Sequence, residues 1–362
     1  MNKKQLTSLT IKGFKVFEDF HINGMKRVNL IGGKNNLGKT SFLEALEMLL
    51  KAKTAFGLRM VSTDIIRRRQ TKKSMSFPQQ QMPIQEIEFD FFANKKNKVI
   101  IQDDKSSIQL RYIDVGEAIE SNTIQMFNAP MVQSFAMDVH KRAPTPFLEF
   151  WAEGDSLASS VQDVVNTFIQ DVNHVEHNVH YISSCTTDET ALAGYYGRLM
   201  MSNQEDFLNA SLQQFDNNML ALKAIPIQGS TVFKLKLKDR DDLILLSSFG
   251  EGINRYIAIL SAIWASKDGY LLIDEIENGI HYTNYPKLWK LIFEASKLAN
   301  CQLFITTHSK ECIEAFNEQN TQDDGAYFEF YRNQKTGKIT AKGRDHEQLE
   351  YALTHQGSIR GE

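Results

Sequence analysis

The sequence predicts an α/β fold with a mixed, largely parallel sheet, an antiparallel β-lobe near the N-terminus and an inserted helical arm. Three observations support this prediction. Residues 6–14 and 15–22 alternate between apolar and polar side chains, as two antiparallel strands do. Apolar strands alternate with helical segments over 226–362, which is typical of a parallel sheet. The apolar strand at 26–33 runs into a glycine-rich loop and a helix at about 39–52.

The helix predicted at 39–52 is amphipathic. Its apolar face carries Phe42, Leu46, Leu49 and Leu50. We expect this face to pack on the sheet, because most of a helix's stability in a protein comes from burying such a stripe. Glu44 and Glu47 lie off this stripe and are expected to point elsewhere.

Residues 53–83 are polar and basic, and this composition favours a mobile insertion. From Lys51 to Lys73 the chain has eight basic residues and one acid, Asp64. Two interpretations stay open for this stretch. It can contact nucleic-acid phosphates, in which case binding is sensitive to salt, or it can be a solvated loop.

The middle of the chain combines strands and helices. Strand patterns occur at 84–92, 98–102, 107–115 and 178–183, and helical patterns at 155–172, 189–200 and 204–225. We expect the helices to form an arm or lid that projects from the core. The chain therefore divides into an N-terminal half of the core domain (1–150), a helical arm (151–225) and a C-terminal half (226–362).

The C-terminal third predicts the rest of the sheet. Strands are expected at 230–239, 243–246, 270–275 and 301–309, and helices at about 250–267, at about 284–299 and from 309. Helices of this length between strands are the usual crossover connections of a parallel sheet.

The loop after the strand at 26–33 has the spacing GxxxxGK[ST] of a phosphate-binding loop. The residues expected to hold the nucleotide phosphates are Gly33, Asn35, Asn36, Gly38, Lys39, Thr40 and Ser41. Backbone N–H groups of 34–39 can wrap a β-phosphate at the helix N-terminus, whose dipole favours an anion. Lys39 then reaches the β- and γ-phosphates, and Thr40 supplies an oxygen to Mg²⁺.

A second group of candidates follows the strand at 270–273. Asp274 and Glu275 come directly after four apolar residues. If this strand lies beside that of the phosphate loop, Asp274 reaches the metal's outer shell and Glu275 can accept a proton from the attacking water. His308 ends the next strand, where a neutral imidazole can sense the γ-phosphate or hold the water.

A second glycine-containing helix start lies at "LLSSFGEGINRYIAIL". Ser248, Gly250 and Gly252 precede or open an amphipathic helix, whose free N–H groups make another anion site. These residues are not expected to reach the phosphate bound by Lys39 in the same subunit, because the first loop already encloses it. We expect them to serve the nucleotide of a second subunit.

Four motifs in this order, separated by a long insertion, resemble the ABC-type ATPases of the SMC and RecF kind. The resemblance rests on "IKGFKVFEDF" with "GGKNNLGKTS", "LSSFGEGINR", "LLIDEIENGIH" and "QLFITTHSKECIEAF", and covers residues 5–50 and 180–355. Within that group the sequence is most similar to the AAA15-like ATPases related to OLD-family proteins and to the ATPase of the PARIS phage-defence system. The resemblance implies an ABC-type P-loop NTPase head.

In these families two heads sandwich two ATP molecules. The resemblance assigns Lys39 and Thr40 to Walker A, Asp274 and Glu275 to Walker B, Ser248–Gly252 to the signature, Asn278–His281 to the D-loop and His308 to the switch histidine. Phe249 and Glu251 depart from the LSGGQ signature of transporters, which argues against transport. Three glutamines, Gln81, Gln85 and Gln133, compete for the Q-loop position.

The resemblance implies a Mg²⁺-dependent ATPase whose ATP-driven head pairing, in a homodimer or higher homo-oligomer, regulates a separate effector protein. The C-terminal segment lacks the acids of a Toprim nuclease, so a Toprim or HNH nuclease or toxin in antiphage defence is expected to be another polypeptide. One alternative is a RecF-like repair or recombination ATPase that binds DNA through residues 53–83. Another alternative is a scaffold protein whose nucleotide is structural and is hydrolysed slowly.

Composition narrows the class of protein. The 41 basic and 44 acidic residues give a net charge of −3, so no global field draws the chain to nucleic acid or to an anionic membrane. Cys185, Cys301 and Cys312 lie far apart, which argues against disulfides and zinc sites. The triplet-spaced His174, His177 and His180 lack a well-placed carboxylate and are not expected to bind metal. No apolar run approaches the ~18 residues of a membrane span, so we expect a cytoplasmic protein.

Overall fold

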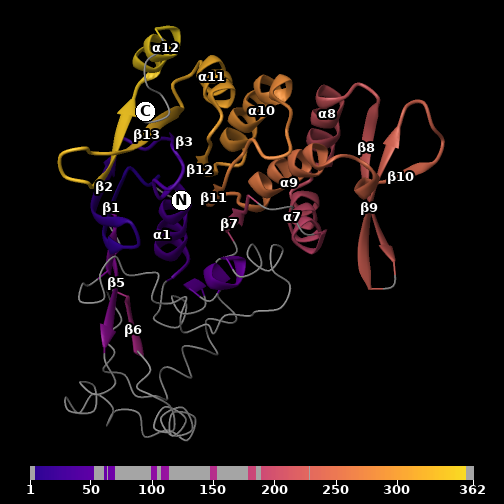
Figure 1. Ribbon diagram of the computed structural model, residues 1–362. Helices are drawn as coiled ribbons and strands as arrows, with labels where there is room; N and C mark the ends of the chain where they lie inside the picture. Colours follow the sequence, from indigo (N-terminus) through magenta and orange to yellow (C-terminus); the bar gives the residue numbers. More distant parts are fainter. Residues whose placement is uncertain are drawn as a thin grey trace, which may run out of the picture.

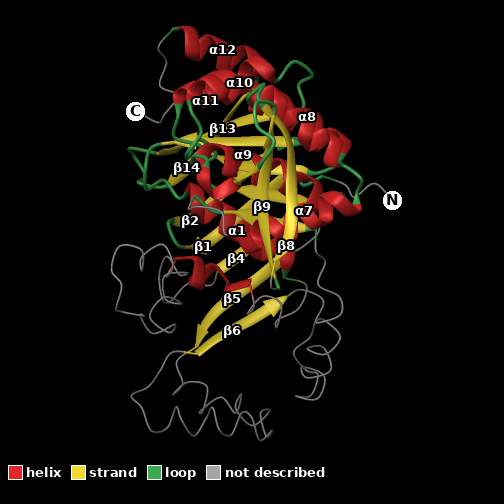
Figure 2. Cartoon of the chain, turned by 90° about the vertical axis from the view of Figure 1, so that its right-hand side faces the viewer, coloured by secondary structure: helices red, strands yellow, loops and turns green. Residues whose placement is uncertain are grey.

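The computed structural model describes residues 5–52, 61–62, 64–69, 99–103, 107–113, 147–152, 178–184, 189–227 and 229–355. These residues form three sheets that are covered by helices (Figures 1 and 2). Outside the described residues lie the predicted strand at 84–92, the predicted helix at 155–172, Gln81, Gln85, Gln133, Cys185, His174 and His177. None of the helices in the described ranges combines the length and the hydropathy needed to cross a bilayer.

The central sheet has six strands. Their order is β14 (Ile339–Arg344), β13 (Gly325–Arg332), β3 (Val28–Gly33), β12 (Gln302–Thr306), β11 (Tyr270–Ile273) and β7 (Val179–Ile182). Neighbouring strands are parallel except for the antiparallel pair β13 and β14. Every residue of β3 and β12 is buried, as expected of strands covered on both faces. The predicted mixed, largely parallel sheet is confirmed.

Helices cover both faces of this sheet and divide the core in two. They are α1 (Lys39–Lys51), α9 (Glu251–Ala265), α10 (Tyr285–Leu298), α11 (Lys310–Gln319) and α12 (His346–Thr354). Along β12, Leu303 and Ile305 pack into the core shared with α9 and α10, whereas Phe304 packs into the core shared with α1. Figure 1 shows α1 on the other side of the strands from α9 and α10. Strand alternation thus fixes which helix each side chain meets.

The predicted antiparallel β-lobe is also present. Its strands are β2 (Phe17–Asn23), β1 (Ser8–Phe14), β4 (Val99–Gln102), β5 (Ser107–Ile113) and β6 (Phe147–Ala152), in that order. Aromatic rings join this sheet to α1 and to the central sheet. Phe20 and Phe42 both contact Phe330 edge to face, with ring centroids 5.1 and 5.4 Å apart. The lobe is therefore packed against the helix that follows the phosphate loop.

The segment assigned to a helical arm contains two described helices, α7 (Glu189–Met201) and α8 (Glu205–Phe215). Both are packed against the core by their apolar faces, so these two helices do not project from it as predicted. Leu192, Leu199, Leu208 and Leu212 are buried in the same core as α9. Figure 1 shows α7 and α8 on either side of α9.

The prediction of one helix over 204–225 is wrong in its second half. α8 ends at Phe215, and strand β8 (Met219–Ile227) follows and pairs with β9 (Ser230–Leu237), which pairs with β10 (Leu243–Leu245). The Asp216 carboxylate accepts a hydrogen bond of 2.9 Å from the backbone N–H of Asn218. Such a local bond favours a turn over a continuing helix.

Glu44 and Glu47, which the sequence places off the apolar stripe of α1, are both buried in ion pairs. Glu44 binds Lys15 and Arg69, and Glu47 binds Lys51 and Arg68. Burial acts to raise the pKa of both carboxyls, but the neighbouring cations outweigh it and lower each pKa, so both stay ionised. The described helical residues 64–69 of the basic segment are thus bound to α1.

Replacing the buried carboxylate, Glu47→Gln, should lower the free energy of unfolding at pH 7 by about 2 kcal/mol, since two cations lose their charged partner. Thermal unfolding measures this change. Because the folded-state pKa of Glu47 is lowered, the stabilisation by its carboxylate is complete above about pH 4.3, the ordinary glutamate pKa. This stabilisation is lost as the pH falls through the folded-state pKa. The difference in the free energy of unfolding between variant and parent should therefore become smaller in acid.

The matched control for this prediction is Glu314→Gln. Glu314 pairs with Lys310 at 3.4 Å on the surface, where both side chains are exposed. Exposed pairs contribute only about 0–1 kcal/mol, so its unfolding temperature should hardly change. Equal losses in both variants would contradict the structural role given to Glu47.

Candidate phosphate-binding site

The loop between β3 and α1 has the backbone conformation that its glycines allow. Gly33 has a φ of 138° and Gly38, the N-cap of α1, a φ of 82°. A Cβ on Gly33 would lie 2.5 Å from the carbonyl oxygen of Phe330, so a larger residue does not fit there. No side chain caps α1, which leaves its first N–H groups for an anion.

Lys39 lies across the mouth of this loop. Its Nζ donates to the carbonyl oxygens of Gly33 and Lys34, each at 2.7 Å, and lies 3.2 Å from Nδ1 of His308. Burial lowers the pKa of Lys39 to about 8, against the opposing effect of nearby carboxylates, of which Glu277 is the strongest. The ammonium group is thus held at the loop that the sequence predicts to bind phosphate.

Thr40 and Asp274 meet beside Lys39. The Thr40 hydroxyl donates to the two Asp274 carboxylate oxygens at 3.1 and 3.2 Å, and Thr306 donates to Asp274 at 2.8 Å. A hydroxyl and a carboxylate are the oxygen ligands that Mg²⁺ takes when phosphates and water complete its shell. The donor set therefore fits magnesium.

Glu275 has the left-handed backbone conformation rare for a residue with a side chain, with a φ of 50°. Its Oε2 accepts from Nδ2 of Asn278 at 2.8 Å, and its Oε1 lies 3.7 Å from Nε2 of His308. Strained backbone of this kind clusters at functional sites. Glu275 is partly exposed, so water can reach its free lone pairs.

His308 lies between Lys39 and Glu275. An ammonium group only donates, so Nδ1 of His308 accepts from Lys39 and the ring proton sits on Nε2, facing Glu275. Burial, followed by the charge of Lys39, lowers the pKa of His308, which keeps the imidazole neutral near pH 7. The Glu277 carboxylate accepts from the backbone N–H of His308 and so holds the backbone that carries the ring.

The sheet order explains why these residues meet. Strands β3, β12 and β11 are adjacent and parallel, so their carboxyl ends lie at one edge of the sheet. Gly33, His308 and Asp274 each lie at or just after such an end. Ligand sites in open α/β sheets form at this edge.

The signature residues lie elsewhere. Gly250 is the N-cap of α9, and Ser248 and Gly250 are exposed. Within the described ranges no hydrogen bond joins Ser248, Gly250 or Gly252 to the phosphate loop. Gly252 packs against the D-loop instead, where a Cβ would lie 2.4 Å from the carbonyl oxygen of Gly279.

Three residues near the site were not among the candidates. Thr306 binds both Asp274 and the backbone N–H of Glu275, Glu277 binds His308, and Arg255 binds the backbone after β11. The sequence gave a signal for Thr306, because this residue directly precedes Thr307 and His308 at the strand end. Arg255 gave none, because its partners are backbone carbonyls.

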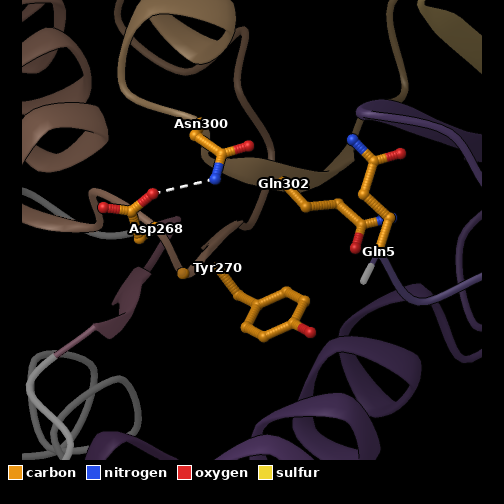
Figure 3. Close-up of a pocket in the computed structure, with 6 residues that line it drawn as sticks. Gln5, Asp268, Tyr270, Asn300 and Gln302 are labelled. Atoms are coloured by element: carbon orange, nitrogen blue, oxygen red, sulfur yellow. Dashed lines mark hydrogen bonds between the residues drawn. The ribbon is translucent and has the colours of Figure 1, made fainter. Parts of the chain in front are cut away.

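A small pocket lies at the opposite edge of the sheet (Figure 3). Tyr270 and Gln302, which line it, are the first residues of β11 and β12. Its polar groups bind one another: Asn300 donates to Asp268 at 2.8 Å, and Gln302 accepts from the backbone N–H of Leu6 at 2.9 Å. We therefore assign this pocket to the packing of the strand starts.

Comparisons with known proteins show the family and the fold of the chain. Residues 28–314 match the AAA_21 family, described as "AAA domain, putative AbiEii toxin, Type IV TA system". An "ATP/GTP phosphatase" of Helicobacter pylori is 26% identical over 98% of this chain and 100% of its own length. An uncharacterized protein of Methanocaldococcus jannaschii, MJECL10, is 38% identical over 15% of this chain and 24% of its own.

Among solved structures, an SMC head bound to the C-terminal winged-helix domain of ScpA aligns with a TM-score of 0.51 and 13% identity. The alignment covers 95% of this chain and 99% of that one. At this identity it shows the fold alone, which is the α/β fold of an SMC head. The family match spans most of the sequence and includes the phosphate loop, Asp274, Glu275 and His308, so the chain belongs to the AAA_21 family and is a P-loop nucleoside-triphosphate hydrolase.

Proposed function

We propose that the protein is a Mg²⁺-dependent ATPase whose heads pair around ATP and thereby regulate a separate effector. The observation that carries the proposal is the meeting of Lys39, Thr40, Asp274, Glu275 and His308 at one edge of the sheet. These residues come from three elements far apart in the chain. Together they supply the phosphate-binding, metal-binding and proton-accepting groups that hydrolysis requires.

Each group has a step in the reaction. The loop N–H groups and Lys39 would hold the β- and γ-phosphates, and Thr40 and Asp274 would hold Mg²⁺, whose charge would offset that of the phosphates. Glu275 orients the attacking water and accepts its proton. His308 lies within reach of both Lys39 and Glu275 and holds the water or the γ-phosphate.

Pairing of two copies follows from the place of the signature. The start of α9 is exposed and unbound to its own phosphate loop, so it is free to bind the γ-phosphate held by another copy. Because ATP would contact both copies, it would bind the paired state preferentially. A homodimer, or a higher homo-oligomer built from such pairs, would thus be the active form. The division of the chain at residues 150 and 225 belongs to the same proposal.

The effector would be a nuclease or toxin encoded separately, of the Toprim or HNH class, within an antiphage defence system. The family description, which names a type IV toxin–antitoxin system, supports a role of this kind. A RecF-like DNA-repair ATPase is the alternative. This alternative relies on the basic residues at 53–83 to contact DNA. Fewer of them are available than the sequence suggests, because Arg68 and Arg69 bind Glu47 and Glu44.

Hydrolysis assays test the proposal. The purified protein should release phosphate from ATP with Mg²⁺ and lose activity when EDTA removes the metal. Because two copies form each complete site, the rate per chain should rise with protein concentration before it levels off. A rate per chain that is constant over a hundredfold dilution would contradict pairing. Stimulation by DNA would favour the RecF-like alternative.

A further inference from the structure

Arg255 links the signature helix to the strand ends of the catalytic site. It lies on α9, is 3% exposed, and its guanidinium group binds three backbone carbonyl oxygens. Nη1 donates to Ser183 at 2.9 Å, and Nη2 donates to Asp274 at 2.7 Å and to Glu275 at 2.8 Å. These carbonyls follow β7 and β11, so one side chain ties α9 to two neighbouring strands.

This contact fixes the backbone that carries the proposed base. The N–H of Glu275 donates to Thr306 at 2.8 Å, and its C=O accepts from Arg255. The carbonyl of the preceding residue, Asp274, also accepts from Arg255. Both peptide groups that set the direction of the Glu275 side chain are thus held, which supports the left-handed conformation at this residue.

The same helix begins with the signature. Arg255 lies four positions after Glu251, so it is on the same face one turn further along α9. Gly252 makes a second contact on this side, against Gly279 of the D-loop. A shift at the start of α9 would therefore move the groups that hold Glu275.

We propose that Arg255 is a positioning residue that couples the signature at the start of α9 to the catalytic Glu275 of the same chain. Phosphate bound by another copy at Ser248 and Gly250 would fix the position of the start of α9, and Arg255 would transmit this position to the base. Each copy would then hydrolyse its own ATP only when it is paired. The inference rests on the proposed ATPase function and adds the path between the two sites.

Arg255→Lys tests the coupling, because a lysine keeps the charge but cannot reach three carbonyls with a planar fork. We expect kcat to fall about 10- to 100-fold, the range found when a residue that orients a functional group is changed. The Kd for ATP and the KM should stay within about threefold, because Lys39 and the loop are unchanged. Arg240→Lys, the same change at an exposed turn, is the control and should match the parent protein.

A double-mutant cycle separates coupling from a merely structural role. Ser248→Ala should also lower kcat, and the Ser248→Ala, Arg255→Lys double variant should be no slower than the slower single variant. If the loss of kcat in the double variant equals the product of the losses in the two single variants, the proposal is overturned. A normal kcat in Arg255→Lys would overturn it too. If Arg255→Lys does not fold, Arg255→Gln, which keeps an amide NH₂ group as donor, replaces it. Loss of ATP binding in both variants would assign Arg255 to stability and overturn the coupling.

Failure of the coupling and failure of the function are distinguishable. The proposed function is rejected if the parent protein does not hydrolyse ATP and Ser248→Ala changes nothing. If the parent protein hydrolyses ATP and Ser248→Ala lowers its kcat, but Arg255→Lys does not, only the role of Arg255 is rejected.

Discussion

Replacing the loop lysine, Lys39→Ala, should abolish ATP binding at micromolar nucleotide. Lys39 is buried and hydrogen-bonded to the loop, and in the proposed site it is the cation that would bind the β- and γ-phosphates. Two charge-assisted hydrogen bonds of about 1.5–3 kcal/mol each are lost, which weakens binding by a factor of at least about 100. Equilibrium titration with a fluorescent ATP analogue measures the loss, and phosphate release should become undetectable.

The control for this change is Lys290→Ala. Lys290 is an exposed lysine of α10 away from the strand ends, so its removal tests the loss of one positive charge alone. It should bind ATP as the parent protein does. Parent-like affinity in Lys39→Ala would show that the loop does not hold the phosphates.

The second large effect is expected for Glu275→Gln, which should bind ATP but hydrolyse it about 1,000-fold more slowly. An amide is the same size as the carboxylate and can still accept from Asn278, but it cannot take a proton from water. General-base catalysis contributes a factor of about 100 to 10,000. In the proposed cycle hydrolysis would release the pair, so the variant should accumulate as ATP-bound dimers.

Light scattering coupled to size-exclusion chromatography measures this accumulation, with and without ATP and Mg²⁺. The mass should double only when both are present. Glu294→Gln, a change at an exposed residue of α10, provides the comparison and should remain as active as the parent protein. An unchanged hydrolysis rate in both Glu275→Gln and Lys39→Ala would refute the assignment of the site.

The sequence predicted the fold and the candidate groups because their signals are local. A buried strand, a glycine-rich loop and an amphipathic helix around Lys39 are contiguous, and each strand end is marked by its own polar residues. Thr40 and Asp274 are 234 positions apart, yet parallel strand order is enough to predict that they meet. The structure brings them within hydrogen-bonding distance.

Other features depend on partners that no local pattern reveals. Glu44 and Glu47 look like solvent-facing positions of α1 until Arg69 and Arg68 from the following segment bind them. The role of Arg255 arises from carbonyl oxygens, which every residue has. The end of α8 depends on a turn formed by Asp216, which competes with the apolar pattern that continues beyond it.

The central claim is that a triphosphate and its metal bind at the strand ends where Lys39, Thr40 and Asp274 meet. Calorimetric titration of the purified protein with ATP and Mg²⁺ tests it most directly. We predict heat of association with one nucleotide per chain, which disappears in Lys39→Ala. Absence of any heat with the parent protein, measured at several temperatures, would contradict the account.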